Sequence, residues 1–319
     1  MNMHKEEIRI LCAHGVPPDM VKRLSEEIGP VEVLSSDDEA EIIRAIQDKQ
    51  VFVVRSKPKV TANVIMNAPN LKVVARPGVG TDNIDKKACE ERGIQVINSP
   101  EASASSVAEL TVGLAIALLR HVYPACYLLK EGQWAKNRYT GKTVEGKVWG
   151  IIGFGGIGRR VAEIAKALRA EVIAYDPYVK DEEFVSKGVK RALRLDELLE
   201  KSDIVSLHVV LNKDTEGLIS EEAIRKMKKG AYLINTSRGK VVNQEALLLA
   251  LDEGHLAGAA LDVYDTEPPT DMSCLQRENL ICTPHIGGST EEAFVNATEI
   301  LINKLKTIFR LGEGVPIGY

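Results

Sequence analysis

Residues 147–158 read KVWGIIGFGGIG, a pattern typical of a buried strand that turns through a glycine-rich loop into a helix. In such a loop Gly153 permits the tight turn, Gly155 lets the backbone approach a pyrophosphate, and Gly158 lets helix and strand pack closely. The apolar residues that follow have helical spacing: Val161, Ile164, Ala165 and Leu168. Because amides at the start of a helix favour an anion, the stretch predicts a dinucleotide-binding loop.

A second strand-like run supports this prediction. Residues 171–175 are followed by Asp176, about 20 residues beyond the loop, where an acid binds the ribose hydroxyls of the nucleotide. Pro177 and Tyr178 come next, so no arginine is placed to accept the 2′-phosphate of NADP, and NAD is the expected cofactor. Glycines also serve ordinary turns, but the combination of strand, loop, helix, strand and acid makes that alternative the weaker one.

The composition is that of an ordinary folded protein. The chain has 319 residues, of which 45% are apolar and 27% are charged, and its length suits two domains of about 100–200 residues each. The formal net charge of −4 argues against nucleic acid or an anionic membrane as the main partner. Any basic site must therefore be local.

Cysteine usage and the apolar runs indicate a cytoplasmic location. The five cysteines form no Cys-x-x-Cys pair, which suits a reducing compartment without a disulfide framework or a zinc site. They are Cys12, Cys89, Cys126, Cys274 and Cys282. No signal peptide is apparent at the N-terminus, and the longest apolar run, residues 110–119, is too short to span a bilayer. We expect this run to form a buried helix.

Short β-branched runs alternate with helical patterns on both sides of the glycine-rich loop. This alternation predicts an α/β protein with two doubly wound, mainly parallel sheets. The expected strands are 8–11, 31–34, 51–54, 72–75 and 94–97 before the loop, and 204–209, 231–235, 258–261 and 279–283 after it. We expect a Rossmann NAD-binding domain at residues 100–287, inserted into a flavodoxin-like substrate-binding domain formed by residues 1–99 and 288–319.

Two segments are expected to connect the domains. Residues 98–106 are rich in small polar side chains, and Ser106 with Glu109 forms a capping-box pattern that predicts a helix start. A second crossing is expected near residues 284–289, before a last helix at residues 291–309. Two connections form a hinge, and the cleft beside a hinge is where a substrate would meet a cofactor.

Hydride transfer to or from a nicotinamide needs a positioned proton carrier, and the chain has six histidines. His285 follows the strand expected at residues 279–283, and active sites form at the carboxyl ends of strands in open α/β sheets. His14 and His208 also follow strands, so either could face the cleft. The alternative for His285 is a capping role at the next helix, together with Ser289 and Thr290.

An arginine follows another strand. Arg238 comes soon after the run at residues 231–235, and Gly239 is expected to permit an unusual backbone turn there. The planar guanidinium of Arg238 could grip a carboxylate and its neighbouring oxygen, a geometry that lysine does not copy. A surface salt bridge is the ordinary alternative.

Three carboxylates follow the strand at residues 258–261. Asp262, Asp265 or Glu267 could orient the histidine, and their spacing alone does not choose among them. A metal cluster is the rival interpretation. No second histidine or cysteine lies at ligand spacing, so we expect no metal.

Four motifs together resemble those of the D-isomer-specific 2-hydroxyacid dehydrogenase family, in the family's order and over essentially the whole chain. They are residues 153–158, 235–239, 262–268 and 283–288. The resemblance implies that Arg238 orients the substrate carboxylate, that Glu267 is the partner of the histidine, and that His285 is the general acid/base. Formate dehydrogenases of the same superfamily lack the Glu–His pairing, so Glu267 favours hydroxy-acid chemistry.

The loop and the resemblance together imply a set of cofactor-binding residues. Asp262 and the backbone at Thr236 are expected to hold the nicotinamide. The full set is Val79, Gly153, Gly155, Gly156, Ile157, Gly158, Asp176, Val209, Thr236, Ser237, Asp262 and Gly287.

Within the family, residues 53–61, 76–85 and 106–111 are most similar to phosphoglycerate dehydrogenases. This similarity implies a substrate site made of Arg55, Arg76, Gly78 and Arg238. The expected reaction is the NAD-dependent oxidation of 3-phosphoglycerate to phosphohydroxypyruvate, in serine biosynthesis. A glyoxylate or hydroxypyruvate reductase is the second expectation, because glyoxylate reductases usually differ at residues 106–109. An NADH-sensing binding protein like the family's corepressor relatives is the third.

Four positions depart from the family's pattern. Gly156 stands where an arginine is common, and Val210 replaces a usual proline, so we expect altered contacts to the cofactor. Ser103 replaces a common asparagine, and Pro77 replaces a small residue, so we expect an altered substrate pocket.

A homodimer is expected, because the helix predicted at residues 106–121 is apolar on most of its sides. Lys136 or Arg138, which follow Trp134, could reach across the dimer interface. The chain stops at Tyr319, short of the regulatory domain of longer phosphoglycerate dehydrogenases, so feedback by serine is not expected.

Overall fold

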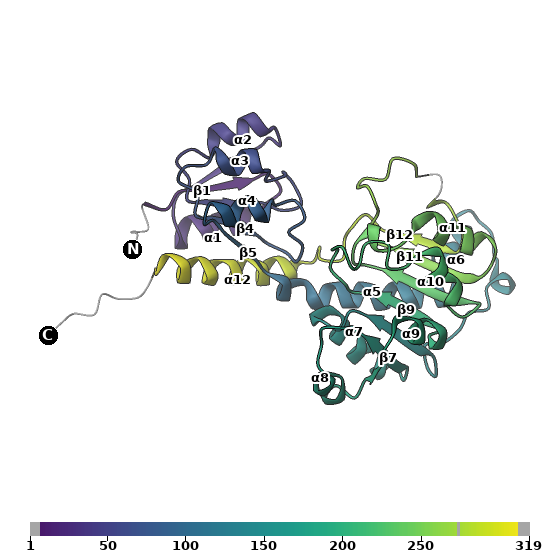
Figure 1. Ribbon diagram of the computed structural model, residues 1–319. Coiled ribbons are helices and arrows are strands. Elements are labelled where there is room, and N and C mark those ends of the chain that lie inside the picture. The colour runs from purple at the N-terminus through teal and green to yellow at the C-terminus, as the bar shows by residue number, and fades with distance from the viewer. Residues whose placement is uncertain (1–6, 273–274, 312–319) are drawn as a thin grey trace. The chain divides into compact units, whose positions relative to one another are not determined.

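A computed structural model describes residues 7–272 and 275–311 of the protein (Figure 1). The chain divides into two compact units. Unit 1 takes residues 1–103 and 289–319, and unit 2 takes residues 104–288. Which unit holds the substrate and which holds the cofactor stays a prediction from the sequence.

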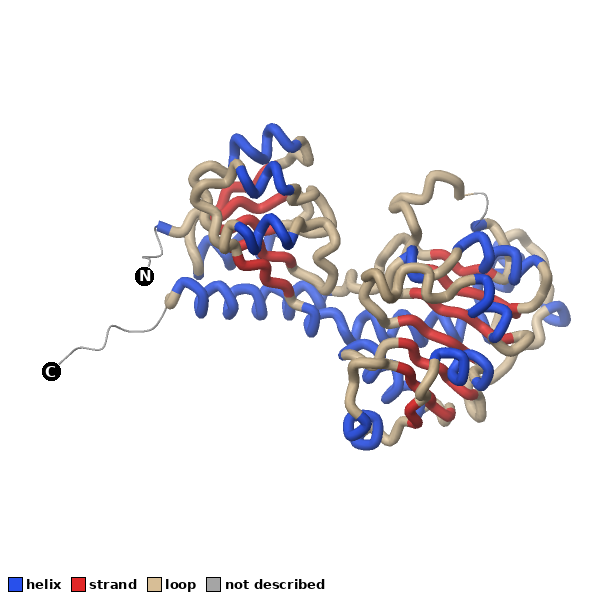
Figure 2. Tube along the Cα trace, in the orientation of Figure 1, coloured by secondary structure: helices blue, strands red, loops and turns tan. Residues whose placement is uncertain are grey.

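Unit 1 is a five-stranded parallel sheet with helices on both of its faces (Figure 2). Its elements are β1 (Ile10–Ala13), α1 (Pro18–Glu27), β2 (Val31–Leu34), α2 (Glu39–Ala45), β3 (Val51–Val53), α3 (Ala62–Met66), β4 (Val73–Arg76), α4 (Lys86–Glu91), β5 (Gln95–Asn98), the 3₁₀ helix η2 (Pro100–Ser103) and α12 (Glu291–Phe309). The strand order is β2-β1-β3-β4-β5. Met20 of α1 and Leu301 of α12 share one buried cluster with Val53, while Ile42 of α2 shares another with Phe52. Neighbouring strand residues thus serve opposite faces.

Unit 2 is a seven-stranded parallel sheet in the order β12-β11-β10-β9-β6-β7-β8. Its elements are α5 (Ala104–Leu119), α6 (Val122–Lys130), η3 (Lys136–Arg138), β6 (Val148–Ile152), α7 (Gly156–Ala167), β7 (Glu171–Tyr175), α8 (Asp181–Ser186), β8 (Lys190–Arg191), α9 (Leu195–Lys201), β9 (Ile204–Leu207), α10 (Glu221–Lys226), β10 (Ala231–Asn235), η4 (Gly239–Val241), α11 (Gln244–Asp252), β11 (Leu256–Leu261) and β12 (Leu280–Cys282). Leu233 of β10 packs with α9, α10 and α11, and Ile234 packs with α5, α7 and α8. The sheet is therefore covered on both faces, as parallel sheets require.

The predicted fold class is confirmed, because both sheets are parallel and doubly covered. The strand at residues 231–235 and the helix at residues 291–309 have the predicted bounds. The predicted capping box is wrong. Ser106 lies inside α5, which begins at Ala104 directly after η2, so the chain is already helical where the pattern predicted a start.

One helical stretch among the described residues, Pro100–Leu119, is long and apolar enough to cross a membrane by length and composition alone. It extends beyond the apolar run at residues 110–119 that the sequence showed. More than half of its most apolar window, 56%, is buried inside the structure, and α5 packs against α7, β10 and β11. A core helix passes the same test, so the stretch is weak evidence for a membrane span.

Candidate active site at the carboxyl edge of the second sheet

Five loops meet at one edge of the sheet in unit 2. The register pairs Ile152 with Leu207, Leu207 with Asn235, Asn235 with Leu261, and Leu261 with Cys282. These five residues end β6, β9, β10, β11 and β12, so the loops that follow leave the sheet side by side. The strand order changes direction between β6 and β9, which is where open α/β sheets bind their ligands.

The glycine-rich loop lies at this switch point. Gly153 has a φ of +92°, and a Cβ added there would lie 2.6 Å from the carbonyl oxygen of His208. A Cβ at Gly158 would lie 2.0 Å from the carbonyl oxygen of Gly153, so helix α7 packs directly on the turn. Gly155, in contrast, faces open space within 4 Å. The loop is thus tight against the protein and open where a ligand would approach.

The loop and the acid that follows β7 fit a dinucleotide. Helix α7 begins at Gly156, so its first amides have no partner within the helix and favour a pyrophosphate. Asp176 accepts hydrogen bonds from the backbone N–H of Phe154 (2.9 Å) and of Tyr178 (2.9 Å), which fix its carboxylate beside the loop. Ile157 packs against the apolar cluster under the sheet. At Gly156, where the family commonly has an arginine, the nearest atom to an added Cβ is Ala104 Cβ at 3.9 Å.

A partly buried histidine follows β9. His208 Nε2 lies 3.0 Å from Ser206 Oγ, which also accepts the indole N–H of Trp149 at 2.9 Å. Its Nδ1 is buried, and no described residue hydrogen-bonds it. Burial lowers the pKa of His208 to about 3. The imidazole is therefore neutral at physiological pH. This makes His208 a poorer candidate for the proton carrier than its place after a strand indicated. Val209 contacts the glycine loop near Gly153.

The neutral His208 predicts a pH dependence of stability. The folded pKa of about 3 lies below the ordinary 6.5, so the unfolded chain binds the extra proton between these values. The contribution of the neutral imidazole to the free energy of unfolding is complete above about pH 6.5 and is lost as the pH falls towards 3. The free energy of unfolding can be measured by urea unfolding at pH 7.5 and at pH 5.5. Over this interval it should fall by about 1 kcal/mol more for the wild type than for His208→Gln. Equal losses in the two proteins would contradict this assignment.

Asp262 holds the loop that follows β12. Its side chain is 1% exposed, and it accepts hydrogen bonds from Thr283 Oγ1 (2.6 Å) and from the backbone N–H of Ile286 (2.8 Å) and Gly287 (2.8 Å). These contacts tie both sides of His285 to the sheet edge. The role at the nicotinamide that the resemblance implied for Asp262 stays a prediction. Thr236, implied for the same role, lies 2.8 Å from Thr111 through the two hydroxyl oxygens.

Arg238 lies on a turn shaped by a fully buried asparagine. Asn235 Nδ2 donates to the carbonyl of Arg238 (2.9 Å), and Asn235 Oδ1 accepts from the backbone N–H (3.0 Å) and hydroxyl (2.8 Å) of Ser237. The guanidinium folds back to donate through Nη1 to the carbonyl of Ser237 at 2.7 Å. The arginine is thus pre-positioned by backbone contacts.

Gly239 does not do what the sequence predicted. Its φ is not among the positive values of the chain, so it supplies no unusual turn. Instead it lies directly on another backbone segment: an added Cβ would lie 1.9 Å from the carbonyl carbon and 2.2 Å from the carbonyl oxygen of Tyr264. The glycine is required for close approach.

Glu267 is the carboxylate that meets the histidine. Glu267 Oε2 lies 2.7 Å from His285 Nδ1, and Glu267 Oε1 accepts the backbone N–H of Tyr264 at 3.2 Å. Burial alone would raise the pKa of Glu267, but the hydrogen bond and charge of His285 outweigh it and lower that pKa. An ionised carboxylate only accepts, so Nδ1 carries a hydrogen and Nε2 is the nitrogen left for a ligand.

His285 has a left-handed backbone conformation, with a φ of 55°. This conformation is uncommon for a histidine and is held by the clamped loop around it. The part of the capping alternative that concerns Thr290 is confirmed, because Thr290 is the N-cap of α12 and its hydroxyl accepts the backbone N–H of Ala293 at 3.2 Å, whereas the imidazole of His285 contacts Glu267. One edge of the sheet thus carries His285, Glu267 and the loops of Arg238 and Asp262.

The predicted substrate residues of the N-terminal segment lie in unit 1. Arg55 Nη1 donates to the carbonyl of Gly15 (3.3 Å), and its guanidinium lies over the ring of Phe294 at 4.9 Å. Arg76 Nη1 donates to Asn83 Oδ1 (3.0 Å), and Asn83 Nδ2 donates back to the carbonyl of Arg55 (2.9 Å). Asn83, which the sequence reasoning missed, therefore links the two arginines.

The other two predicted site residues of unit 1 are Gly78 and Val79, which follow β4. Gly78 has a φ of +141°, and its N–H donates to Ser99 Oγ at 2.9 Å. The carbonyl of Val79 accepts from Asn98 Nδ2 at 2.7 Å. Both follow β4, so they belong to the carboxyl edge of the sheet in unit 1, as Arg55 does after β3.

Within residues 7–272 and 275–311, no group of three or more His, Cys, Asp or Glu side chains is arranged to hold a metal ion. The cysteines among them form no disulfide with one another; they are Cys12, Cys89, Cys126 and Cys282. Cys274 lies outside the described residues, so its reduced state stays a prediction.

Comparison with known proteins gives a consistent result. Residues 112–287 match the model of the D-isomer specific 2-hydroxyacid dehydrogenase, NAD binding domain. The chain is 44% identical to a D-3-phosphoglycerate dehydrogenase of Methanocaldococcus jannaschii, over 97% of this chain and 59% of that protein. It is 45% identical to a hydroxypyruvate reductase of Thermotoga maritima, over 79% of this chain and 82% of that protein.

A solved structure agrees with these relatives. The D-lactate dehydrogenase of Aquifex aeolicus, complexed with NAD and lactic acid, has a TM-score of 0.84 and 31% sequence identity, over 94% of this chain and 95% of that chain. The chain spans about three fifths of the length of the M. jannaschii relative, 59%, and of a second D-3-phosphoglycerate dehydrogenase from Archaeoglobus fulgidus, 58%.

Proposed function

Because the chain belongs to the D-isomer-specific 2-hydroxyacid dehydrogenase family, we propose that it interconverts a D-2-hydroxy acid and its 2-oxo acid with NAD. The observation that carries this proposal is the 2.7 Å contact between Glu267 and His285, at the sheet edge that also bears Arg238 and the glycine-rich loop. A proton carrier, a carboxylate anchor and a dinucleotide loop are the three parts that such a reaction needs from a protein.

Each residue of the site has its own role in the proposed reaction. NAD supplies the hydride acceptor, and its pyrophosphate would lie at the N-terminus of α7 with Asp176 at the ribose hydroxyls. Arg238 binds the substrate carboxylate through two parallel N–H donors. His285 Nε2 takes the hydroxyl proton during oxidation and returns it during reduction. Glu267 holds the imidazole through Nδ1 and stabilises the imidazolium that forms.

We infer that the substrate is 3-phosphoglycerate and that the product is phosphohydroxypyruvate. Relatives at 36–44% identity named D-3-phosphoglycerate dehydrogenase support this choice. A second support is Asn83, which accepts from the guanidinium of Arg76 and donates to the backbone carbonyl of Arg55, so that it connects the segments after β3 and β4. Hydroxypyruvate is the second candidate, because the T. maritima relative at 45% identity is named a hydroxypyruvate reductase.

The test is NADH oxidation with phosphohydroxypyruvate, hydroxypyruvate and glyoxylate compared in one buffer. We expect a kcat/KM at least ~100-fold higher for the phosphorylated acid. Charge-assisted hydrogen bonds from two arginines to the phosphate would contribute several kcal/mol of binding free energy that the unphosphorylated acids lack. The variant Arg55→Gln should abolish most of that preference, while its rate with hydroxypyruvate should stay within about threefold of the wild type. A wild type that uses the unphosphorylated acids equally well would identify a hydroxypyruvate or glyoxylate reductase.

We further infer that the protein is a homodimer. Helix α6 and the segment after it expose a group of large apolar side chains, which we name the α6 surface: Val122, Tyr123, Tyr127, Leu129 and Trp134. Trp134 is 81% exposed. Aromatic side chains of this kind are enriched at interfaces and rare as free clusters on monomers.

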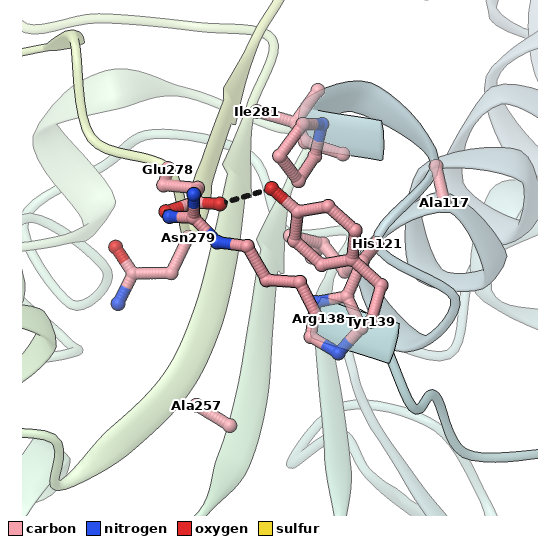
Figure 3. A pocket seen from close by; sticks show the side chains of 10 residues that line it. Ala117, His121, Arg138, Tyr139, Ala257, Glu278, Asn279 and Ile281 are labelled. Carbon is pink, nitrogen blue, oxygen red and sulfur yellow. Dashed lines mark hydrogen bonds and ion pairs between the residues drawn. The ribbon is translucent and has the colours of Figure 1, made fainter. Parts of the chain in front are cut away.

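A cavity of about 400 Å³ has Pro124 of α6 in its lining (Figure 3). It is lined by residues of α5, α6, β11 and β12 and by Arg138 and Tyr139. Figure 3 shows Tyr139 reaching Glu278, whose carboxylate accepts from both Tyr139 Oη and Arg138 Nη2, the latter at 2.8 Å. This attachment fixes the segment after Trp134 on the protein.

Light scattering after gel filtration tests the dimer. The wild type should give twice the chain mass of 34.9 kDa, and Tyr123→Glu combined with Tyr127→Glu should give the single mass. The control is Val185→Glu on α8, since Val185 is equally an exposed apolar residue but lies outside the α6 surface. A monomeric wild type would contradict the inference.

We also infer a cytoplasmic location without nucleic-acid or membrane partners. The cysteines of the described residues, which form no disulfide with one another, fit a reducing compartment, and burial raises the pKa of Cys12 to about 12 and of Cys89 to about 11. The net charge of −4 gives no general attraction to polyanions.

A further inference from the structure

We propose that Gly239 is a positioning residue that locks the arginine loop onto the glutamate–histidine pair, so that the anchor and the proton carrier move as one unit. The proposal rests on the proposed function, since it assigns roles to Arg238, Glu267 and His285. It concerns the contact between the backbone of Gly239 and the peptide that joins Tyr264 to Asp265. We name this contact the backbone joint.

The backbone joint leaves no room for a side chain. A Cβ at Gly239 would lie 1.9 Å from Tyr264 C, 2.2 Å from Tyr264 O and 2.4 Å from Asp265 N. Carbon atoms normally approach to about 3.5–4.0 Å, so the smallest side chain would push the two segments apart by more than ~1 Å. All three atoms belong to the backbone, so no rotamer change relieves the overlap.

The arginine side of the backbone joint is firmly held. Asn235 is fully buried and binds the carbonyl of Arg238, while Ser237 binds Asn235. Gly239 opens η4, and the carbonyls of the next two residues accept the backbone N–H of Gly217 (2.8 Å) and Ile219 (2.9 Å). Gly239 therefore cannot retreat without breaking the turn that carries Arg238.

The other side of the backbone joint is held by a tyrosine that serves both partners of the pair. Tyr264 donates its backbone N–H to Glu267 Oε1 (3.2 Å) and its hydroxyl to the carbonyl of Thr283 (3.0 Å), two residues before His285. The hydroxyl also lies 3.3 Å from the carbonyl of Leu261. Tyr264 is 8% exposed, so its ring is enclosed by the core. A displaced Tyr264 peptide thus shifts Glu267 and the histidine loop together.

The test compares Gly239→Ala with the wild type and with two glycine controls. Gly141→Ala introduces a backbone overlap elsewhere in unit 2, where an added Cβ would lie 2.6 Å from the carbonyl oxygen of Leu119 and 3.0 Å from Arg120 Cα. Gly113→Ala, on α5, meets no atom within 4 Å. The measurements are thermal unfolding, NADH binding by fluorescence, and the pH dependence of kcat and KM with the best 2-oxo acid.

Gly239→Ala should lower kcat/KM by at least ~100-fold, because misplacement by about 1 Å has that cost. We expect KM to rise, since Arg238 moves, and the pH profile of kcat to change, since the Glu267–His285 contact moves. NADH affinity should stay within about threefold of the wild type. Gly141→Ala should lower only the unfolding temperature, and Gly113→Ala should change nothing.

Two results would overturn the proposal. One is a Gly239→Ala protein that unfolds earlier but keeps the wild-type KM and pH profile per folded molecule, as a merely structural glycine would. The other is wild-type behaviour throughout. If Gly239→Ala does not fold, Tyr264→Phe decides: loss of its hydroxyl should lower kcat several-fold and change the pH profile at unchanged KM, and an unchanged profile would overturn the proposal. Turnover by the wild type in the same assay tests the proposed function separately.

Discussion

Replacement of His285 by asparagine is expected to lower kcat at least ~100-fold while NADH binding stays within about threefold of the wild type. Asparagine removes the imidazole but tolerates the left-handed backbone that His285 adopts at a φ of 55°. Alanine would add backbone strain of about 1 kcal/mol or more, and so would mix two causes. The measurements are steady-state turnover with the best 2-oxo acid and the fluorescence of bound NADH.

A matched control exists for this substitution. His121 also has a left-handed backbone, at a φ of 51°, but it lies between α5 and α6, away from the carboxyl edge of the sheet. His121→Asn therefore makes the same change in the same conformation, and it should retain wild-type kcat. A His285→Asn protein that turns over as fast as His121→Asn would remove His285 from the proposed mechanism.

The second large effect is expected at Arg238. Arg238→Lys keeps the charge but loses the planar pair of donors, so kcat/KM for the 2-oxo acid should fall about 10- to 100-fold, mainly through KM. Thermal unfolding is measured alongside, because the guanidinium also donates to the carbonyl of Ser237 and a loss of that bond must be separated from a loss of substrate binding. The readout is the KM for the acid at saturating NADH.

Arg277→Lys is the control for the loss of a planar guanidinium. Arg277 pairs with both carboxylate oxygens of Asp252, through Nε at 2.7 Å and Nη2 at 2.8 Å, and lies outside the loops at the sheet edge. This surface pair is worth little, about 0–1 kcal/mol, so the variant should keep wild-type kinetics. If Arg238→Lys also keeps the wild-type KM, the substrate carboxylate is bound elsewhere.

Local signals in the sequence were sufficient for the framework of the site. The spacing of Gly153, Gly155 and Gly158 depends on turn geometry and on the approach of a helix to its own strand, which involves residues close in sequence. Arg238 and His285 could be singled out because each follows a strand, and parallel strands bring their carboxyl ends to one edge. These inferences need only periodicity and topology.

Other assignments could not be made from residue spacing, and only the resemblance to the family favoured Glu267 over its neighbours. Asp262, Asp265 and Glu267 all follow β11, and which of them meets His285 depends on the path of the loop. Glu267 lies 18 residues before His285, and Asp262 binds the backbone N–H of Ile286 from 24 residues away. Such contacts exist only after β11 and β12 pair, because that pairing sets the distance between their loops.

The helix start and Gly239 show the same division between local and tertiary information. The capping pattern of Ser106 and Glu109 was overridden because η2 leads directly into α5, whose buried face packs on α7, β10 and β11. Gly239 was correctly marked as special, but for a torsion that it does not adopt.

The sequence by itself determined the α/β class, the dinucleotide loop and the strand ends that bear functional groups, because backbone torsion and side-chain alternation are properties of short segments. Only the tertiary structure decided that Asp262 clamps the histidine loop and that Gly239 is a contact, while Glu267 meets His285 as the family resemblance implied. Each of these depends on two loops separated in sequence, and their approach is set by the packing of the sheet beneath them.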